Sequence, residues 1–138
     1  MKYIFPAVFT PAEEGGYLVN FPDITDHTSY ACMTEGDMLE EALDMASDVL
    51  NLTLWSMEED GAPVPRASAI QEMKAPEGGF VNLISANTRA YREKYDTRAV
   101  RKNVTIPHWL DVLGTKNKVN FSKVLQDALM KELHVHRA

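Results

Sequence analysis

The stretch TRAVRKNVTIPHWLDVLG, residues 97 to 114, changes its periodicity at a proline. Before the proline, apolar and polar side chains alternate as they do on the two faces of a strand. The apolar positions are Val100, Val104 and Ile106, and the polar positions are Arg101, Asn103 and Thr105. Pro107 suits the first turn of a helix, and an apolar helical pattern follows it. The stretch therefore predicts a strand followed by a helix.

A second helix is predicted directly downstream, with Asn120 as its N-cap. Its apolar stripe consists of Phe121, Val124, Leu125, Ala128, Leu129 and Leu133. One strand alone leaves its backbone unpaired, and two short helices bury little apolar surface, so about 40 residues of this kind are not stable alone. Two copies that pair their strands into an antiparallel ribbon solve both problems. We therefore expect a homodimer formed through this segment.

The polar face of such a ribbon has a chemical use, because a two-stranded ribbon fits the major groove of DNA. Arg101 suits guanine, Asn103 suits adenine, and Thr105 serves either. The alternative is an ordinary solvated strand face, and the two helices that follow favour DNA reading. Trp109 belongs to a core or to an interface, and its helical register with Leu113 favours the core.

Charge divides the chain of 138 residues into two parts. Residues 1–96 hold six Lys or Arg against seventeen Asp or Glu, whereas residues 97–138 hold eight against three. Such an asymmetry is typical of segments with different partners, although a solvated acidic face is the simpler reading of the first part. A single cysteine excludes an internal disulfide framework. With no apolar leader or membrane-length apolar run, we expect a cytoplasmic protein.

The acidic part predicts strands and one long helix. MKYIFPAVFTP and GYLVNFPDI are strand patterns joined by AEEGG, a hairpin loop, and SYACMT is a third short strand. Pro6 is expected at an edge or a bulge, because proline cannot donate to a ladder. An apolar helical pattern runs from near Met38 to about Gly61, and Asp37 with Glu40 resembles a capping box. Residues 78–85 supply another strand, so we expect an α+β fold.

The pattern VRKNVTIP, a helix, then NFSKVLQDALMKEL resembles a ribbon-helix-helix DNA-binding domain. The resemblance implies base contacts from Arg101, Asn103 and Thr105. It also implies phosphate contacts at the start of the second helix, from Phe121, Ser122 and Lys123. Free amides and the helix dipole attract anions at that position.

The earlier part has a resemblance of its own. A hairpin ending in YLVNFPDI, followed by EGDMLEEALDMASDVL, is similar to the HicB antitoxin family. The resemblance implies a partial ribonuclease-H-like, toxin-binding domain over residues 1–85, a linker over 86–97 and a ribbon-helix-helix domain over 98–138. Residues 86–97 also fit a short helix. It further implies a HicA toxin partner that cleaves messenger RNA, repression of its own operon, and no enzyme activity or cofactor.

A few residues also fit a nuclease, a metal site or a reactive thiol. Asp23, Asp26 and His27 lie close enough in sequence to assist a metal-dependent nuclease, but turn residues in a polar loop are favoured. His134 and His136 are a weak metal signal, and we assign no metal. Cys32 reads as a small buried residue. The alternative function is a ligand-responsive ribbon-helix-helix repressor, and the acidic part also leaves room for assembly beyond a dimer.

Overall fold

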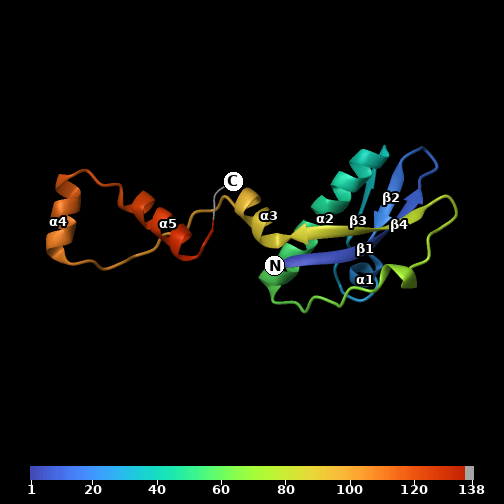
Figure 1. The fold of residues 1–138 in the computed structure, drawn as a ribbon, viewed down its shortest axis with the longest axis horizontal. Helices are drawn as coiled ribbons and strands as arrows, with labels where there is room; N and C mark the ends of the chain where they lie inside the picture. Colours follow the sequence, from blue (N-terminus) through green and yellow to red (C-terminus); the bar gives the residue numbers. More distant parts are fainter. Residues whose placement is uncertain (136–138) are drawn as a thin grey trace. The chain divides into compact units, whose positions relative to one another are not determined.

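A computed structural model describes residues 1–135 (Figure 1). The chain forms two compact units, residues 1–96 and 97–138, which we call unit 1 and unit 2. Within the described residues, no helix is long and apolar enough to cross a membrane.

Unit 1 is built on an antiparallel sheet with the strand order β3-β2-β1-β4. The strands are β1 (Lys2–Pro11), β2 (Tyr17–Asn20), β3 (Met33–Gly36) and β4 (Phe80–Asn87). The predicted β1–β2 hairpin is confirmed, and its loop needs glycine because Gly15 and Gly16 have φ angles of 97° and 76°. Gly16 is doubly constrained, since a Cβ there would lie 2.1 Å from the carbonyl oxygen of Gly36.

The edge position predicted for Pro6 is confirmed locally, because β1 lies between β2 and β4 but Pro6 itself is paired only with β4. The physical reason is local. β2 pairs with β1 only from Val8 to Pro11, so a residue without an N–H group costs no bond to β2 at position 6. The chain leaves β2 and enters the short helix α1 (Pro22–Thr25), which lies against β1.

The long helix α2 (Leu39–Asp60) packs against β2, β3 and β4 and closes the core of unit 1. Its buried side chains meet the inward side chains of the sheet, which include Phe5, Phe9 and Val19. The buried residues of α2 are Ala42, Ala46, Leu50, Asn51, Thr53, Leu54 and Met57. The helix therefore follows the apolar spacing that predicted it.

The prediction for α2 is right at its C-terminal end and wrong about the cap at its N-terminal end. The end at Gly61 is confirmed: its φ of 68° lets the amides of Gly61 and Ala62 bond to the carbonyls of Glu58 and Met57. The capping box is wrong. Met38 is the N-cap, with no side-chain cap bond, so Asp37 stands one residue too early to cap the helix.

Most of the predicted linker, residues 86–97, is ordered structure. β4 continues to Asn87, and α3 (Thr88–Tyr95) follows it within unit 1. The Asn87 side chain accepts a hydrogen bond from the Ala90 amide and so begins the helix. A single turn of 3-10 helix, η1 (Ile70–Glu72), lies in the segment between α2 and β4.

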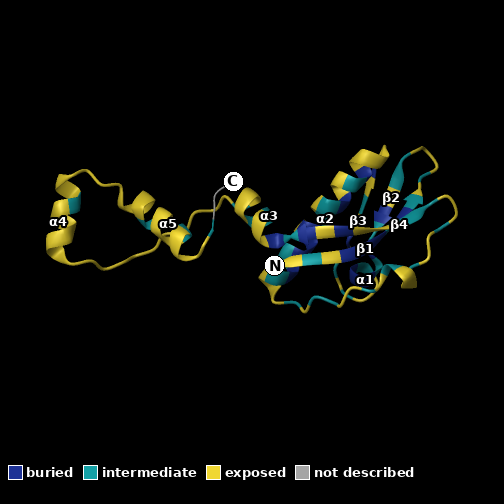
Figure 2. Ribbon diagram, viewed as in Figure 1, coloured by how far each residue is buried: buried dark blue, intermediate teal, exposed yellow. Residues whose placement is uncertain are grey.

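Unit 2 contains α4 (His108–Lys116) and α5 (Phe121–Glu132). Residues 96–107 form neither helix nor strand in the single chain. Neither helix has a buried residue, as the exposed colouring in Figure 2 shows. Trp109 is 65% exposed, so its expected place in a core is wrong for the single chain.

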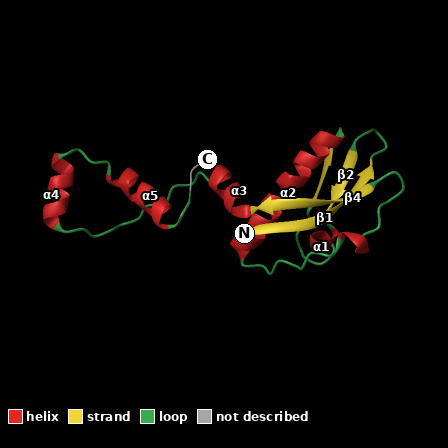
Figure 3. Cartoon of the chain, in the orientation of Figure 1, coloured by secondary structure: helices red, strands yellow, loops and turns green. Residues whose placement is uncertain are grey.

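Figure 3 shows the resulting α+β architecture, a four-stranded antiparallel sheet with several helices, which confirms the expected fold class. The ribonuclease-H-like and ribbon-helix-helix assignments stay predictions.

Candidate functional site

The residues predicted to read DNA lie together in unit 2. Arg101, Asn103 and Thr105 are exposed within residues 96–107, the segment that forms no strand in the single chain. A strand needs a partner for its backbone groups, and none of residues 1–135 pairs with this segment. Val100 and Val104, which alternate with these residues, are 88% and 62% exposed. The two faces predicted from the alternation are therefore not formed in the single chain.

The predicted phosphate-contacting residues begin α5. The Asn120 side chain accepts a hydrogen bond from the Lys123 amide at 3.1 Å, which confirms the predicted N-cap. Phe121, Ser122 and Lys123 are all exposed and occupy the first turn, where helix amides and the dipole favour an anion. The Phe121 ring packs against Gly114 of α4, so closely that a Cβ added at Gly114 would lie 2.8 Å from the ring.

Unit 2 also contains an apolar groove of about 700 Å³ between the extended segment, α4 and α5. Its walls include Val104, Ile106, Leu110 and Val124. All four side chains are at least 39% exposed, although each belongs to a predicted apolar face. Within the described residues of unit 2, the groove is thus an exposed apolar surface.

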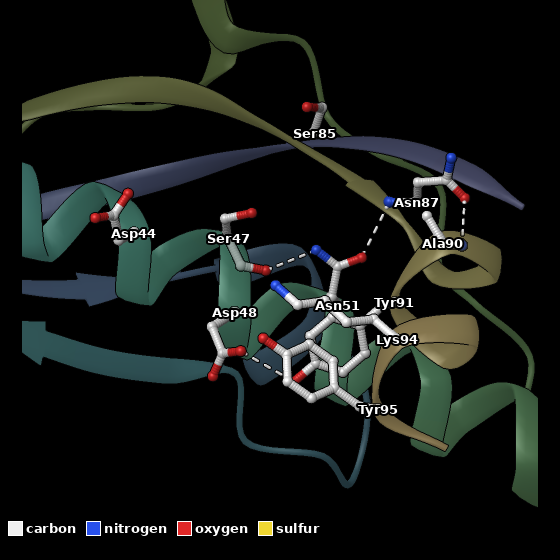
Figure 4. Close-up of a pocket in the computed structure, with 10 residues that line it drawn as sticks. All are labelled: Asp44, Ser47, Asp48, Asn51, Ser85, Asn87, Ala90, Tyr91, Lys94 and Tyr95. Carbon is white, nitrogen blue, oxygen red and sulfur yellow. Dashed lines mark hydrogen bonds between the residues drawn. The ribbon is translucent and has the colours of Figure 1, made fainter. Parts of the chain in front are cut away.

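Unit 1 has a second groove, of about 620 Å³, between α2, the end of β4 and α3 (Figure 4). Figure 4 shows polar and aromatic side chains along its walls. From α2 come Asp44, Ser47, Asp48 and Asn51, from β4 Ser85 and Asn87, and from α3 Ala90, Tyr91, Lys94 and Tyr95.

The walls of this groove are joined by hydrogen bonds. The Tyr91 hydroxyl donates to Asp48 at 2.9 Å, and burial together with this bond raises the pKa of Tyr91 to about 12. The side chain of buried Asn51 accepts from the Asn87 amide and donates to the Ser47 carbonyl. These bonds fix α2, β4 and α3 to one another.

Cations and aromatic rings meet on α3. The ring centroids of Tyr91 and Tyr95 are 4.5 Å apart, and the Lys94 ammonium lies 5.2 Å from the Tyr95 centroid. Arg92 reaches Glu58 at 3.2 Å and Glu59 at 3.6 Å on α2. Sequence reasoning missed this site, because its one available signal was Asn87, a good N-cap residue before a polar segment.

Carboxylates dominate α2, which contains no Lys or Arg. Its acidic residues are Glu40, Glu41, Asp44, Asp48, Glu58, Glu59 and Asp60. The acidic character predicted for residues 1–96 is therefore concentrated on the helix that forms one wall of the groove.

The candidate nuclease residues do not form a metal-binding or catalytic site. Asp23 is 4% exposed, and its two carboxylate oxygens accept from the Ser68 amide at 2.8 Å and the Ser68 hydroxyl at 2.6 Å. Asp26 and His27 are exposed. Among residues 1–135, no three His, Cys, Asp or Glu side chains form a group able to hold a metal.

The remaining candidate residues are a cysteine and two histidines. Cys32 is buried, as predicted, and burial raises the pKa of its thiol to about 11, which disfavours a reactive thiolate. His134 follows α5 with a φ of 55°. His136 lies outside the described residues.

Comparison with known proteins gives a family match over both units. The family model described as "HicB_like antitoxin of bacterial toxin-antitoxin system" matches residues 5–128. Antitoxin HicB 1 of Photorhabdus laumondii subsp. laumondii is 43% identical over 61 residues, 44% of this chain and 36% of that protein. Antitoxin HicB of Escherichia coli K12 is 35% identical over 66 residues, 48% and 44% of the two chains. The chain thus matches less than half the length of these relatives.

Solved structures with a similar fold cover nearly the whole chain. A chain of a toxin-antitoxin complex from Streptococcus pneumoniae has a TM-score of 0.60 and 27% identity, covering 96% of this chain and 99% of that one. Antitoxin HicB of Burkholderia pseudomallei has a TM-score of 0.51 and 22% identity, covering 95% and 98%. The second likeness concerns the fold alone.

Proposed function

Because the chain belongs to the HicB-like antitoxin family, we propose that it binds and neutralises a HicA-like toxin and represses its own operon. Unit 1 binds the toxin, and a dimer of unit 2 binds DNA. The observation that carries the proposal is the family match over residues 5–128, which spans both units. Binding takes the place of catalysis, and no enzyme activity is assigned to the chain.

Charge supports the toxin partner. A toxin that cleaves messenger RNA presents positive charge to phosphate, and unit 1 carries seventeen carboxylates against six basic side chains. The likeness to a chain of the Streptococcus pneumoniae toxin-antitoxin complex adds to this argument.

The uncovered apolar surface of unit 2 supports the homodimer. Its exposed apolar side chains belong to the extended segment, α4 and α5, and include Val100, Val104, Trp109, Leu113, Val124 and Leu129. A second copy would pair with the segment as an antiparallel strand and cover the apolar groove. That pairing completes the ribbon-helix-helix domain.

The polar side of the same ribbon supports DNA binding. In it Arg101, Asn103 and Thr105 of both copies face the bases, while Phe121, Ser122 and Lys123 hold a phosphate at the start of α5. Unit 2 has a net positive charge, which suits the phosphate backbone.

Co-purification tests the proposal. A tagged copy is expressed together with its neighbouring reading frames, and the proteins that remain bound are identified by mass. We expect a small basic protein whose RNA cleavage this chain suppresses. Recovery of a dimer alone, with intact DNA binding, would instead support the ligand-responsive repressor.

A further inference from the structure

We propose that the groove between α2, β4 and α3 is a receptor for an arginine side chain of the toxin, taken from the surface with which the toxin binds RNA phosphate. This inference rests on the proposed function and assigns its contact surface. In this complex Asp44 and Asp48 take the place of phosphate oxygens, so binding and neutralisation are the same event.

Two carboxylates on one wall are available to a cation. Asp44 and Asp48 are one helical turn apart on α2, and both are exposed. Within residues 1–135, Asp44 has neither a hydrogen-bond nor a salt-bridge partner. Asp48 accepts the Tyr91 hydroxyl through Oδ1 and keeps its other oxygen for a second donor. No Lys or Arg of α2 competes for either group.

The opposite wall supplies the aromatic surface that a planar cation prefers. Tyr95 is 51% exposed, and its ring already has the Lys94 ammonium at 5.2 Å. The ring can therefore hold a cation, and Lys94, which also lines the groove, gives up this place to the arginine on binding. Tyr91 packs between Tyr95 and Trp55, with ring centroids at 4.5 and 5.9 Å, so its orientation is set before binding.

The chemistry selects arginine over lysine. A guanidinium presents several N–H donors in a fixed plane, so it can bond to carboxylates while it stacks on a tyrosine ring. Two hydrogen bonds hold the walls in place, one from the Asn87 backbone amide to Asn51 and one from the Tyr91 hydroxyl to Asp48. This preorganisation lowers the entropic cost of binding. A ribonuclease is a natural source of such an arginine, because arginine is over-represented where phosphate is bound through two parallel hydrogen bonds.

The test measures the affinity of the full chain for the small basic toxin encoded beside it. Asp44→Asn with Asp48→Asn removes two charges but keeps both shapes, and an amide oxygen at position 48 still accepts the Tyr91 hydroxyl. The matched control is Glu13→Gln with Glu14→Gln, which removes two charges from the exposed β1–β2 loop. Tyr95→Ala and Tyr95→Phe separate the ring from the hydroxyl.

We expect the groove variant to bind the toxin about tenfold or more weakly than wild type, and the loop variant to bind within about twofold of wild type. The salt dependence of the affinity should fall only for the groove variant. Tyr95→Ala should weaken binding and Tyr95→Phe should not. Equal losses in both double variants would overturn the groove and leave a diffuse acidic field. Wild-type affinity in the groove variant would overturn the groove and leave the antitoxin function standing. Failure of the wild-type chain to bind the toxin would overturn the proposed function itself.

Discussion

At the scale of single residues, unit 1 depends on inward-facing polar side chains that form hydrogen bonds between distant parts of the sequence. Asp23 ties the segment after α2 to α1 through Ser68. Thr88, with no exposed surface, bonds to Glu58 and to the Met1 carbonyl. Each contact joins parts of the chain that are far apart in sequence, so each is a local point of failure.

We predict that Asp23→Asn lowers the free energy of unfolding by about 1–3 kcal/mol, because its amide nitrogen cannot accept from Ser68. Ser68→Ala should cost less, since the backbone bond to Asp23 remains. Chemical denaturation of both variants measures the difference. Metal-dependent RNA cleavage by the wild-type chain, lost in a fully stable Asp23→Asn variant, would contradict this role and support a nuclease.

We predict that Arg101→Ala and Asn103→Ala each cost about 1–3 kcal/mol of specific operator binding and leave toxin inhibition intact. Lys102→Ala is the matched control, because it removes a positive charge from the other face of the predicted strand. Operator titrations at fixed salt measure the losses. Unchanged affinity in both variants would remove the ribbon assignment.

Alkaline pH should destabilise unit 1. Burial raises the pKa of Cys32 to about 11 and that of Tyr91 to about 12, so the folded chain holds these protons more tightly than the unfolded chain. That stability is complete below about pH 9 and is lost as pH rises through 9 to 12. Unfolding followed at several pH values should show the fall, with a shallower start for Cys32→Ala. A constant free energy of unfolding up to pH 11 would be inconsistent with buried, protonated groups.

At the scale of elements, α3 is held by polar contacts more than by apolar burial. Thr88 is its one buried residue among those described, and the helix has eight residues, too few to be stable alone. Arg92 bonds to α2 through Glu58 and Glu59. Because α3 also forms one wall of the groove, its attachment to α2 determines the shape of the proposed arginine site.

We predict that Arg92→Ala loosens α3 by up to about 1 kcal/mol, an amount typical of a partly exposed ion pair. Amide hydrogen exchange should quicken in residues 88–95 and stay slow in the sheet. Arg89→Ala is the control, since Arg89 pairs with Glu93 inside the same helix. Equal acceleration in both variants would indicate loss of helix propensity instead of loss of the contact with α2.

Elements with one clear period were predictable from sequence, and elements that depend on partners were not. The spacing of apolar residues predicted α2 almost to its ends, because the same residues form the core. The edge position of Pro6 was predictable from its missing N–H group, whereas the residue at which β2 stops along β1 is a tertiary property. A short helix was one of two alternatives for residues 86–97, and α3 fulfils it, but its groove was missed because the contacts come from α2 and β4 and leave no periodic pattern in residues 88–95.

At the scale of the whole molecule, unit 2 leaves large apolar side chains exposed in the single chain. Trp109, wrongly expected in a core, is 65% exposed, and residues 96–107 form no strand. The sequence pattern anticipated a second copy, and the homodimer stays a proposal.

We predict that Val104→Lys abolishes the dimer, because it places a charge on the predicted apolar side of the ribbon. Thr105→Lys, one residue along on the opposite face, should leave the dimer intact. Sedimentation equilibrium distinguishes the two. A wild-type chain that is monomeric at micromolar concentration, or two variants that both dimerise, would contradict the paired ribbon.

The central claim is neutralisation by binding, and a titration tests it most directly. The small basic protein encoded beside this chain is purified, its cleavage of RNA is measured, and increasing amounts of the full chain are added. The account predicts that cleavage falls to background at an equimolar ratio and that the inhibited protein is recovered in complex with the chain. Cleavage that continues at full rate in the presence of excess folded chain would contradict it.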